Sequence, residues 1–218
     1  MAKQLLLLLL LLPILSIGQK SNFGNWYNYF GNKLLNNNFN WHHEVQFRNY
    51  NAIGDLEQLL IRTGLGYNLS ESNNNLLLGY GFIKSENYIN DSEIKENLNE
   101  HRIFQQFITR QNFGRVSFQH RYRFEQRILE EEFKLRFRYF LSTNIALSNK
   151  TLIDNTIYLT AYNEIFINTK EILFDRNRLY GGLGYKLDSN LKFEVAYMNQ
   201  FLNAYNRDQL NLMMFLTF

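Results

Sequence analysis

The chain has 218 residues, and its 23 Lys and Arg nearly balance its 20 Asp and Glu, which leaves a formal net charge of +3. This balance gives no case for nucleic-acid binding, which relies on concentrated positive charge. The sequence contains no cysteine, so disulfides do not stabilise the fold. The mean hydropathy is slightly negative. This value excludes a bundle of membrane-spanning helices but not a barrel, in which only alternate residues face lipid.

The N-terminus has the pattern of a secretory signal peptide. Lys3 lies close to the start, and an apolar run over residues 5–17 follows it. The run is shorter than the roughly 20 residues that a transmembrane helix needs. The small residues Ser16 and Gly18 precede a cleavage point before Gln19 with the spacing that signal peptidase requires. We therefore predict a signal peptide that is removed on export.

Beyond the signal, a series of segments alternates in polarity or is rich in aromatic residues, with turn residues between the segments. A period of two is the period of a β-strand, in which neighbouring side chains point to opposite faces. The exported chain also lacks proline, which suits long uninterrupted strands. Residues 84–97 are polar and are expected to form a long loop. In chain order, the predicted strands cover residues 23–30, 39–49, 56–69, 76–82, 101–110, 116–127, 133–147, 156–168, 177–187, 191–201 and 210–218.

The clearest alternation lies in residues 116–139. One face of this stretch is apolar and aromatic, with Phe118, Tyr122 and Phe137 among its residues. The opposite face carries a dense row of charge. A soluble sandwich would turn the charged face to water, whereas a membrane barrel would turn it to the lumen. The charged residues of this face are Arg121, Arg123, Glu125, Arg127, Lys134, Arg136 and Arg138.

These charged faces argue against the dry core of a sandwich, because a buried unpaired charge is costly. In a wet lumen the Arg and Lys side chains can pair with carboxylates on other strands. We therefore predict an all-β fold, an antiparallel transmembrane β-barrel over residues 19–218 after the signal peptide over 1–18. A soluble periplasmic β-protein is the alternative. The expected carboxylate partners are Glu44, Glu125, Glu132 and Glu164.

The strand number follows from where the chain ends should lie. Bacterial barrels normally have an even number of strands, which brings both ends to the periplasm. Counting back from Phe218 gives about ten strands and leaves residues 23–30 outside the wall, and twelve strands are the alternative. The short turns at 70–75, 112–114 and 188–190 then share one end of the barrel, which is expected to be periplasmic.

The last residue, Phe218, follows apolar residues at every second position. This pattern resembles the C-terminal signature that outer-membrane proteins present to the barrel assembly machinery. The expected location is therefore the outer membrane of a Gram-negative cell, in the manner of a porin. The expected partners are outer-membrane lipid and the assembly machinery. No nucleic acid is expected as a partner, and the sequence points to no particular solute.

Five short motifs are HRYRFEQR at 120–127, RFRY at 136–139, NEIF at 163–166, NRLYG at 177–181 and YMNQ at 197–200. They resemble recurring motifs of the domain of unknown function 2490, a family common among Bacteroidota whose members are predicted outer-membrane β-barrels. The resemblance spans most of the exported chain. It implies a location and a fold, but no established activity and no functional residues.

The four histidines form no recognisable catalytic or metal site. His43 and His120 fall on apolar faces, where a place in an aromatic girdle is the commoner explanation. His42 and Glu44 share a face, but two ligands do not make a zinc site. We therefore expect no enzyme activity, no metal and no cofactor. An outer-membrane lipid hydrolase that uses Ser and His is the alternative.

The charged inner face is the remaining candidate site. Barrels of about eight strands have interiors filled by side chains, and ten to twelve strands are closer to that case than to the open channels of 16–18 strands. We therefore predict an integral outer-membrane barrel with a narrow or plugged lumen. A small anion-preferring channel or transporter is the alternative. The predicted lumen network comprises Arg121, Arg123, Glu125, Arg127, Lys134, Arg136, Arg138, Glu164 and Arg178.

Overall fold

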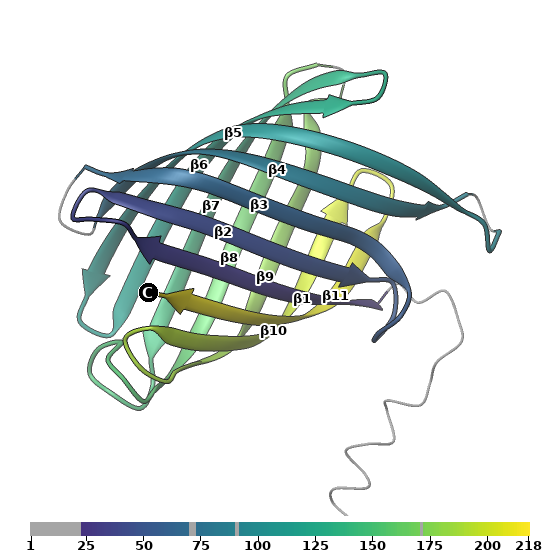
Figure 1. Cartoon of the computed structure of the whole chain (residues 1–218). Coiled ribbons are helices and arrows are strands. Elements are labelled where there is room, and N and C mark those ends of the chain that lie inside the picture. The colour runs from purple at the N-terminus through teal and green to yellow at the C-terminus, as the bar shows by residue number, and fades with distance from the viewer. Residues whose placement is uncertain (1–22, 70–72, 90–91, 171) are drawn as a thin grey trace, which may run out of the picture.

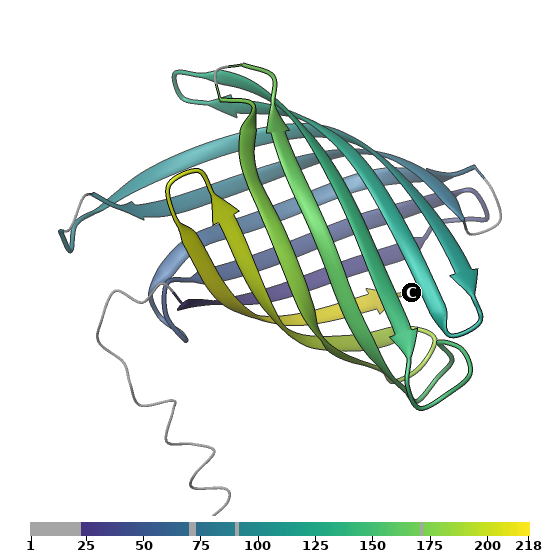
Figure 2. The same cartoon turned by 180° about the vertical axis from the view of Figure 1, so that it is seen from behind.

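The computed structural model describes residues 23–69, 73–89, 92–170 and 172–218 of the chain. These residues form a closed barrel of eleven β-strands that follow one another around the wall in sequence order (Figures 1 and 2). Neighbouring strands pair antiparallel, except that the first and last strands pair in parallel and close the barrel. The strands are β1 (Phe23–Leu34), β2 (Phe39–Asn49), β3 (Leu56–Asn68), β4 (Asn74–Tyr88), β5 (Lys95–Phe113), β6 (Val116–Leu129), β7 (Phe133–Ala146), β8 (Thr156–Asn168), β9 (Phe174–Lys186), β10 (Leu191–Leu202) and β11 (Asn206–Thr217).

The predicted all-β barrel is confirmed, with eleven strands in the described residues in place of the expected ten. The additional strand is β1, which an even count leaves outside the wall. Trp26 and Asn28 of β1 face the lumen, whereas Tyr27 and Tyr29 face outward. Parallel pairing with β11 gives the backbone of β1 a partner on its second edge. The predicted signal peptide lies outside the described residues.

Because the number of strands is odd, the start of the first strand and the end of the last strand lie at opposite rims of the barrel. β1 begins at what we call the N-terminal rim, and β11 finishes at the C-terminal rim (Figure 1). The β3–β4, β5–β6 and β9–β10 connections all lie at the C-terminal rim, so the three turns expected at one end do share it. The β4–β5 and β10–β11 connections lie at the N-terminal rim.

The expected loop over residues 84–97 is wrong, because most of this segment continues the sheet. β4 runs to Tyr88 and β5 begins at Lys95, and these two residues are paired in register. Sheet hydrogen bonds use the backbone, so polar side chains do not end a strand. The hairpin projects past the N-terminal rim (Figure 1). Its base is fixed to the β2–β3 connection, where Asp55 Oδ1 lies 2.5 Å from Lys95 Nζ.

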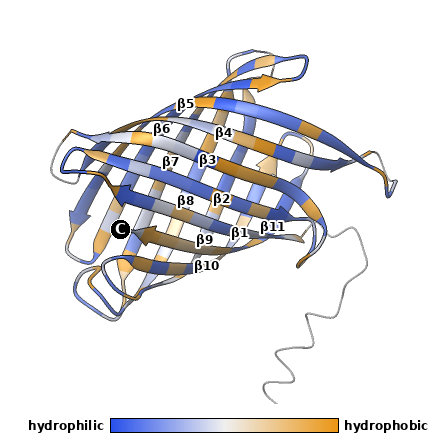
Figure 3. Cartoon of the chain, in the orientation of Figure 1, coloured by the Kyte–Doolittle hydropathy of each residue, from blue (hydrophilic) through white to orange (hydrophobic). Residues whose placement is uncertain are grey.

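Apolar and polar residues alternate along the strands (Figure 3). The exposed residues of the outer face are largely apolar, and most buried residues of the inner face are polar or charged. Outward-facing leucines such as Leu78 are largely exposed, at 60% for Leu78. Inward positions carry buried charged, amide and aromatic side chains. Gly79 faces the Phe104 ring, which occupies the space that a Cβ at position 79 would need. In the described residues no helix is long and apolar enough to cross a membrane.

Candidate functional site

A continuous chain of ion pairs connects neighbouring strands on the inner face of the wall. Glu125 on β6 is fully buried and faces Arg136 of β7 in the strand register. It accepts hydrogen bonds from Arg136 Nη2 and from Arg138 Nη1, each at 2.6 Å. Arg138 also donates to Glu164 of β8, and the same carboxylate oxygen pairs with Arg121 Nη2 at 2.8 Å. Each carboxylate is therefore shared between cations, which replaces the water that these charges would need.

The chain of ion pairs extends to the next two strands. Arg136 Nη1 lies 2.7 Å from Asp175 Oδ2 on β9. Arg178, also on β9, has its Nη1 3.6 Å from Glu164 Oε2 and donates through Nε to Gln200 Oε1 on β10 at 2.8 Å. The network thus links β6 to β10 through side chains that point into the same lumen.

Two separate ion-pair groups lie on other parts of the inner wall. Arg62 Nη1 of β3 pairs with Glu44 Oε1 of β2 at 2.5 Å. Glu100 of β5 accepts from Arg102 Nε at 2.6 Å and from Arg127 Nε of β6 at 2.5 Å. Every glutamate of these groups is buried, so its charge depends on the arginines beside it.

Aromatic rings lie against the guanidinium groups of the network. A guanidinium group can hydrogen-bond at its edge while its planar face stacks on a ring, which is a favourable contact for a buried Arg. Arg48 Cζ lies 3.6 Å from the centre of the Trp26 ring. Four cations surround the buried Phe166 ring, at Cζ-to-centre distances of 5.1 Å for Arg136, 4.4 Å for Arg138, 5.8 Å for Arg176 and 4.6 Å for Arg178.

Each of the eleven strands of the described barrel contributes an almost fully buried side chain to the lumen. Together these side chains fill the lumen along part of its length, and we call the layer that they form the central band. A filled interior is expected for a barrel only slightly wider than eight strands. From β1 to β11, the central band consists of Trp26, Arg48, Leu60, Ile83, Phe104, Glu125, Arg136, Phe166, Arg178, Met198 and Gln209.

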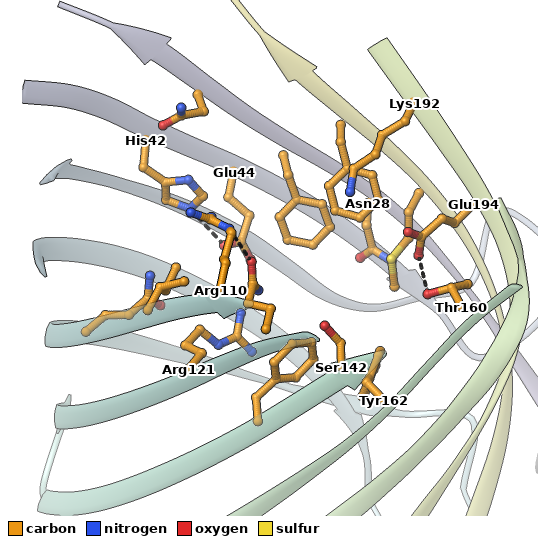
Figure 4. A pocket seen from close by; sticks show the side chains of 18 of the residues that line it. Asn28, His42, Glu44, Arg110, Arg121, Ser142, Thr160, Tyr162, Lys192 and Glu194 are labelled. Carbon is orange, nitrogen blue, oxygen red and sulfur yellow. Dashed lines mark hydrogen bonds and ion pairs between the residues drawn. The ribbon is translucent and has the colours of Figure 1, made fainter. Parts of the chain in front are cut away.

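Between the central band and the C-terminal rim the lumen widens into a cavity of about 540 Å³, which we call the vestibule. It runs from Trp26 and Arg123 at the band to Asn112 and Thr217 near the rim. Its lining includes eight Arg and Lys but only three Glu, so the vestibule is basic. Figure 4 shows side chains that point into it from opposite walls, among them His42, Glu44, Arg110, Arg121, Lys192 and Glu194.

The comparison with protein families matches this barrel to a family of proteins of unknown function, DUF2490, over residues 23–211. The chain belongs to the DUF2490 family. The match begins with β1 and ends within β11, so it spans the barrel wall. The family suggested by the sequence motifs is therefore confirmed. No curated protein and no solved structure matched the chain.

In this DUF2490 barrel, the nine residues predicted to form the lumen network all lie on inward-facing parities of their strands. Lys134 differs from the others, because it lies at the N-terminal rim and pairs with the exposed Glu132 at 2.5 Å. Arg123 donates to Gln106 Oε1, at 2.9 Å from its Nε. Phe218 lies at the C-terminal rim with its ring centre 5.7 Å from that of His43.

Other charged residues of the inner wall were not predicted. Glu100 and Arg102 lie on a strand whose faces the sequence pattern does not assign, because the apolar Phe104 faces inward and the polar Gln105 faces outward. Arg48 lies on a clearly alternating strand, and its polar parity is the signal that places it in the lumen.

His42, His43 and His120 of the DUF2490 barrel face as strand parity predicts, whereas the sequence pattern assigns no face to His101. His42 faces the lumen, and its Nε2 lies 3.3 Å from Glu44 Oε2. His101 and His120 face outward and contact the hydroxyl groups of tyrosines, at 2.6 Å and 2.9 Å respectively. Among the described residues no histidine hydrogen-bonds to a serine, and no three His, Asp or Glu side chains gather as a metal site would require.

Proposed function

We propose that this DUF2490 protein is an integral outer-membrane β-barrel whose lumen is closed to solutes. The main support for a closed lumen is the central band. Glu125, Arg136 and Phe166 expose at most 3% of their surface, so water has almost no access at this layer. A hydrated ion could pass only if the paired side chains separated, which would leave buried charges without partners.

The outer surface supports a membrane location. Exposed apolar side chains come from strands all around the wall, and a soluble protein seldom exposes so extensive an apolar surface. Outward-facing charges such as Lys33 and Asp208 lie toward strand ends, where a lipid headgroup region would accept them. The exposed apolar residues include Ile61, Leu78, Ile103, Leu159, Leu179, Val195 and Leu212.

Polar groups on the outer surface also pair with one another. Gln105 Nε2 and Gln126 Nε2 each donate to the other's Oε1, at 3.4 Å and 3.0 Å. Asn163 and Asn177 form a second reciprocal pair, at 2.8 Å and 3.3 Å. Water would satisfy exposed amides without such pairs, whereas lipid would not. The pairing therefore favours lipid over water as the surroundings of this surface.

The proposed partners are outer-membrane lipid along the wall and the barrel assembly machinery during insertion. The last strand supports the second partner, because Leu210, Leu212 and Met214 alternate along its outward face up to Phe218. Alkaline extraction of membranes from cells that produce the protein tests the location. We expect the protein to stay in the membrane pellet, and release into the soluble fraction would contradict insertion.

Planar-bilayer recordings test whether the lumen is closed. We expect no conductance steps from the purified wild-type protein. A variant with Glu125→Ala, Arg136→Ala and Arg138→Ala empties part of the central band, and we expect it to produce small conductance steps if it inserts. Steps from the wild type that carry more anions than cations would overturn closure and favour the alternative of an anion channel, which the basic vestibule suggests.

A lipid hydrolase is the second alternative, and the His42–Glu44 contact is the one observation that favours it. Incubation of the purified protein with phospholipid vesicles tests this activity. We expect no release of fatty acid. Release that His42→Ala abolishes would replace the closed-barrel proposal with an enzymatic function.

A further inference from the structure

The vestibule has more positive charge than its own carboxylates can balance. Eight Arg and Lys and three Glu line it, which leaves a formal surplus of five positive charges. Enclosed charges of one sign repel one another and lack most of the solvent that would screen them. A surplus of this size therefore favours an anion from outside the chain.

The three glutamates of the vestibule already have partners. Glu44 pairs with Arg62 at 2.5 Å, and Glu164 is shared by Arg121, Arg138 and Arg178. Glu194 accepts hydrogen bonds from the hydroxyl groups of Tyr158 and Tyr180, each at 2.9 Å. These carboxylates are not available to the remaining cations.

Three cations of the vestibule have no carboxylate within 4 Å among the described residues. Arg48 hydrogen-bonds to neutral Gln46 and Gln58. Arg110 donates to Gln119 at 2.9 Å, and the ammonium of Lys192 lies 4.3 Å from the centre of the Phe215 ring. Arg110 and Lys192 lie on opposite sides of the vestibule in Figure 4.

Unused hydrogen-bond donors lie at the deep end of the vestibule. Arg123 Nη1 has no hydrogen-bond acceptor within the described part of the chain, and the nearest carboxylate oxygen, on Glu125, is 3.7 Å away. The Arg123 side chain is 1% exposed. Arg62 Nε and Arg121 Nε also have no acceptor among the residues that the structure describes. Buried donors normally have partners, so these three guanidinium groups offer hydrogen bonds to an acceptor that enters the cavity.

We propose that the vestibule binds a small organic anion through a carboxylate or phosphate group. The acidic group lies between Arg121 and Arg123, which are two residues apart on the inner face of β6. Guanidinium groups suit this role because their planar donors match the oxygens of both acids. The volume of about 540 Å³ is within the range of small-molecule sites.

The walls of the vestibule indicate the rest of the ligand. Phe30, Phe140 and Tyr162 line it together with Met213. Arg121 Cζ lies 4.3 Å from the centre of the Phe140 ring, so the cationic and aromatic surfaces adjoin. A ligand with an aromatic or apolar body next to its acid group would contact both surfaces, whereas an inorganic anion would contact only the first.

Calorimetric titration of the detergent-solubilised full-length protein tests the proposal with benzoate, phenyl phosphate, inorganic phosphate and benzamide. Benzamide has the shape of benzoate without its charge. We expect benzoate or phenyl phosphate to bind, and inorganic phosphate and benzamide to bind at least about tenfold more weakly. Equal binding of benzoate and benzamide would overturn recognition of an anion, and no binding of either organic anion would overturn the site.

Matched variants locate the site. Lys192→Met and Lys134→Met remove the same charge, but Lys192 lines the vestibule and Lys134 lies at the opposite rim. We expect Arg123→Met to weaken anion binding about tenfold, the effect of losing one charge-assisted hydrogen bond. Lys192→Met should also weaken it, because it removes one positive charge from the lining. Lys134→Met should leave it unchanged. Equal effects of Lys192→Met and Lys134→Met would overturn the location, and Lys192→Met keeps the test valid if Arg123→Met does not fold.

Binding and closure are measured separately, so their failures are distinguishable. Binding in detergent does not require a closed lumen, and absence of conductance does not require a ligand. If the wild-type protein conducts ions and also binds benzoate, the proposal of a closed lumen is overturned and the proposal of a vestibule site stands.

Discussion

The Glu125 carboxylate and the Arg138 guanidinium group form an ion pair at 2.6 Å, and neither side chain exposes more than 5% of its surface. Glu125 lies on β6 and Arg138 on β7, and Arg138 carries the contact on to Glu164 of β8. A pair at such depth stabilises the fold only while both partners are present, because removal of one leaves the other buried and uncompensated.

Glu125→Gln should therefore destabilise the barrel by about 3–5 kcal/mol, since Arg136 and Arg138 would lose their shared carboxylate. Urea unfolding in lipid vesicles, followed by tryptophan fluorescence, measures the change. Glu132→Gln is the matched control, because Glu132 pairs with Lys134 at an exposed position. It should cost about 1 kcal/mol or less. Equal costs for both variants would show that the central ion pairs do not stabilise the fold.

Gly79 makes room for the Phe104 ring, so Gly79→Ala should destabilise the barrel by about 1–3 kcal/mol through overpacking. Gly181→Ala is the control, because no atom lies within 4 Å of the added Cβ and the glycine is exposed on a strand. The same unfolding assay compares the two. Combining Gly79→Ala with Phe104→Leu should recover part of the loss, and no recovery would argue against this contact as the cause.

The Gln105–Gln126 pair tests whether lipid surrounds the outer wall. Gln105→Leu leaves the Gln126 amide unpaired, which should cost about 1–3 kcal/mol in lipid. Gln105→Leu with Gln126→Leu replaces both partners by apolar groups and should restore stability to near the wild-type value. A single variant as stable as the wild type in vesicles would indicate that water reaches this surface.

The two rims should lie on opposite sides of the outer membrane. The chain has no cysteine, so a single introduced cysteine reports its own position. Ala204→Cys lies in the β10–β11 connection and Ser189→Cys in the β9–β10 connection, at opposite rims. With a membrane-impermeant maleimide, we expect labelling of Ala204→Cys in intact cells. Ser189→Cys should react only after permeabilisation, and labelling of both in intact cells would contradict a spanning barrel.

The sequence pattern predicts the wall best where the two faces differ most. β6 and β7 alternate between aromatic residues and arginines, so parity places Arg121, Glu125 and Arg136 on one charged face, and the barrel prediction turns that face to the lumen. The pattern does not reveal the two faces of β5, because the apolar Phe104 packs inward against Gly79 and the polar Gln105 pairs with Gln126 on the outer face. Its neighbours Glu100 and Arg102 were missed for the same reason.

Cross-strand partners depend on strand order and register, which alternation does not fix. Lys134 shares the parity of Arg136, yet its position near the rim pairs it with Glu132. The place of β1 in the wall was not predicted for a different reason. An even strand count is a regularity of bacterial barrels, whereas the physical requirement is that both edges of every strand be paired, and parallel pairing with β11 meets it.

The parallel seam between β1 and β11 also restricts how the polypeptide can be rearranged. Phe23 pairs with Asp208 and Asn32 with Thr217, so the start of β1 and the finish of β11 are separated by the full height of the wall. Asp208 and Thr217 are nine residue steps apart, which corresponds to roughly 30 Å at about 3.4 Å per residue. A circular permutant that joins these two points therefore needs a linker of at least about nine extended residues. A permutant of an even-stranded barrel needs only a tight turn.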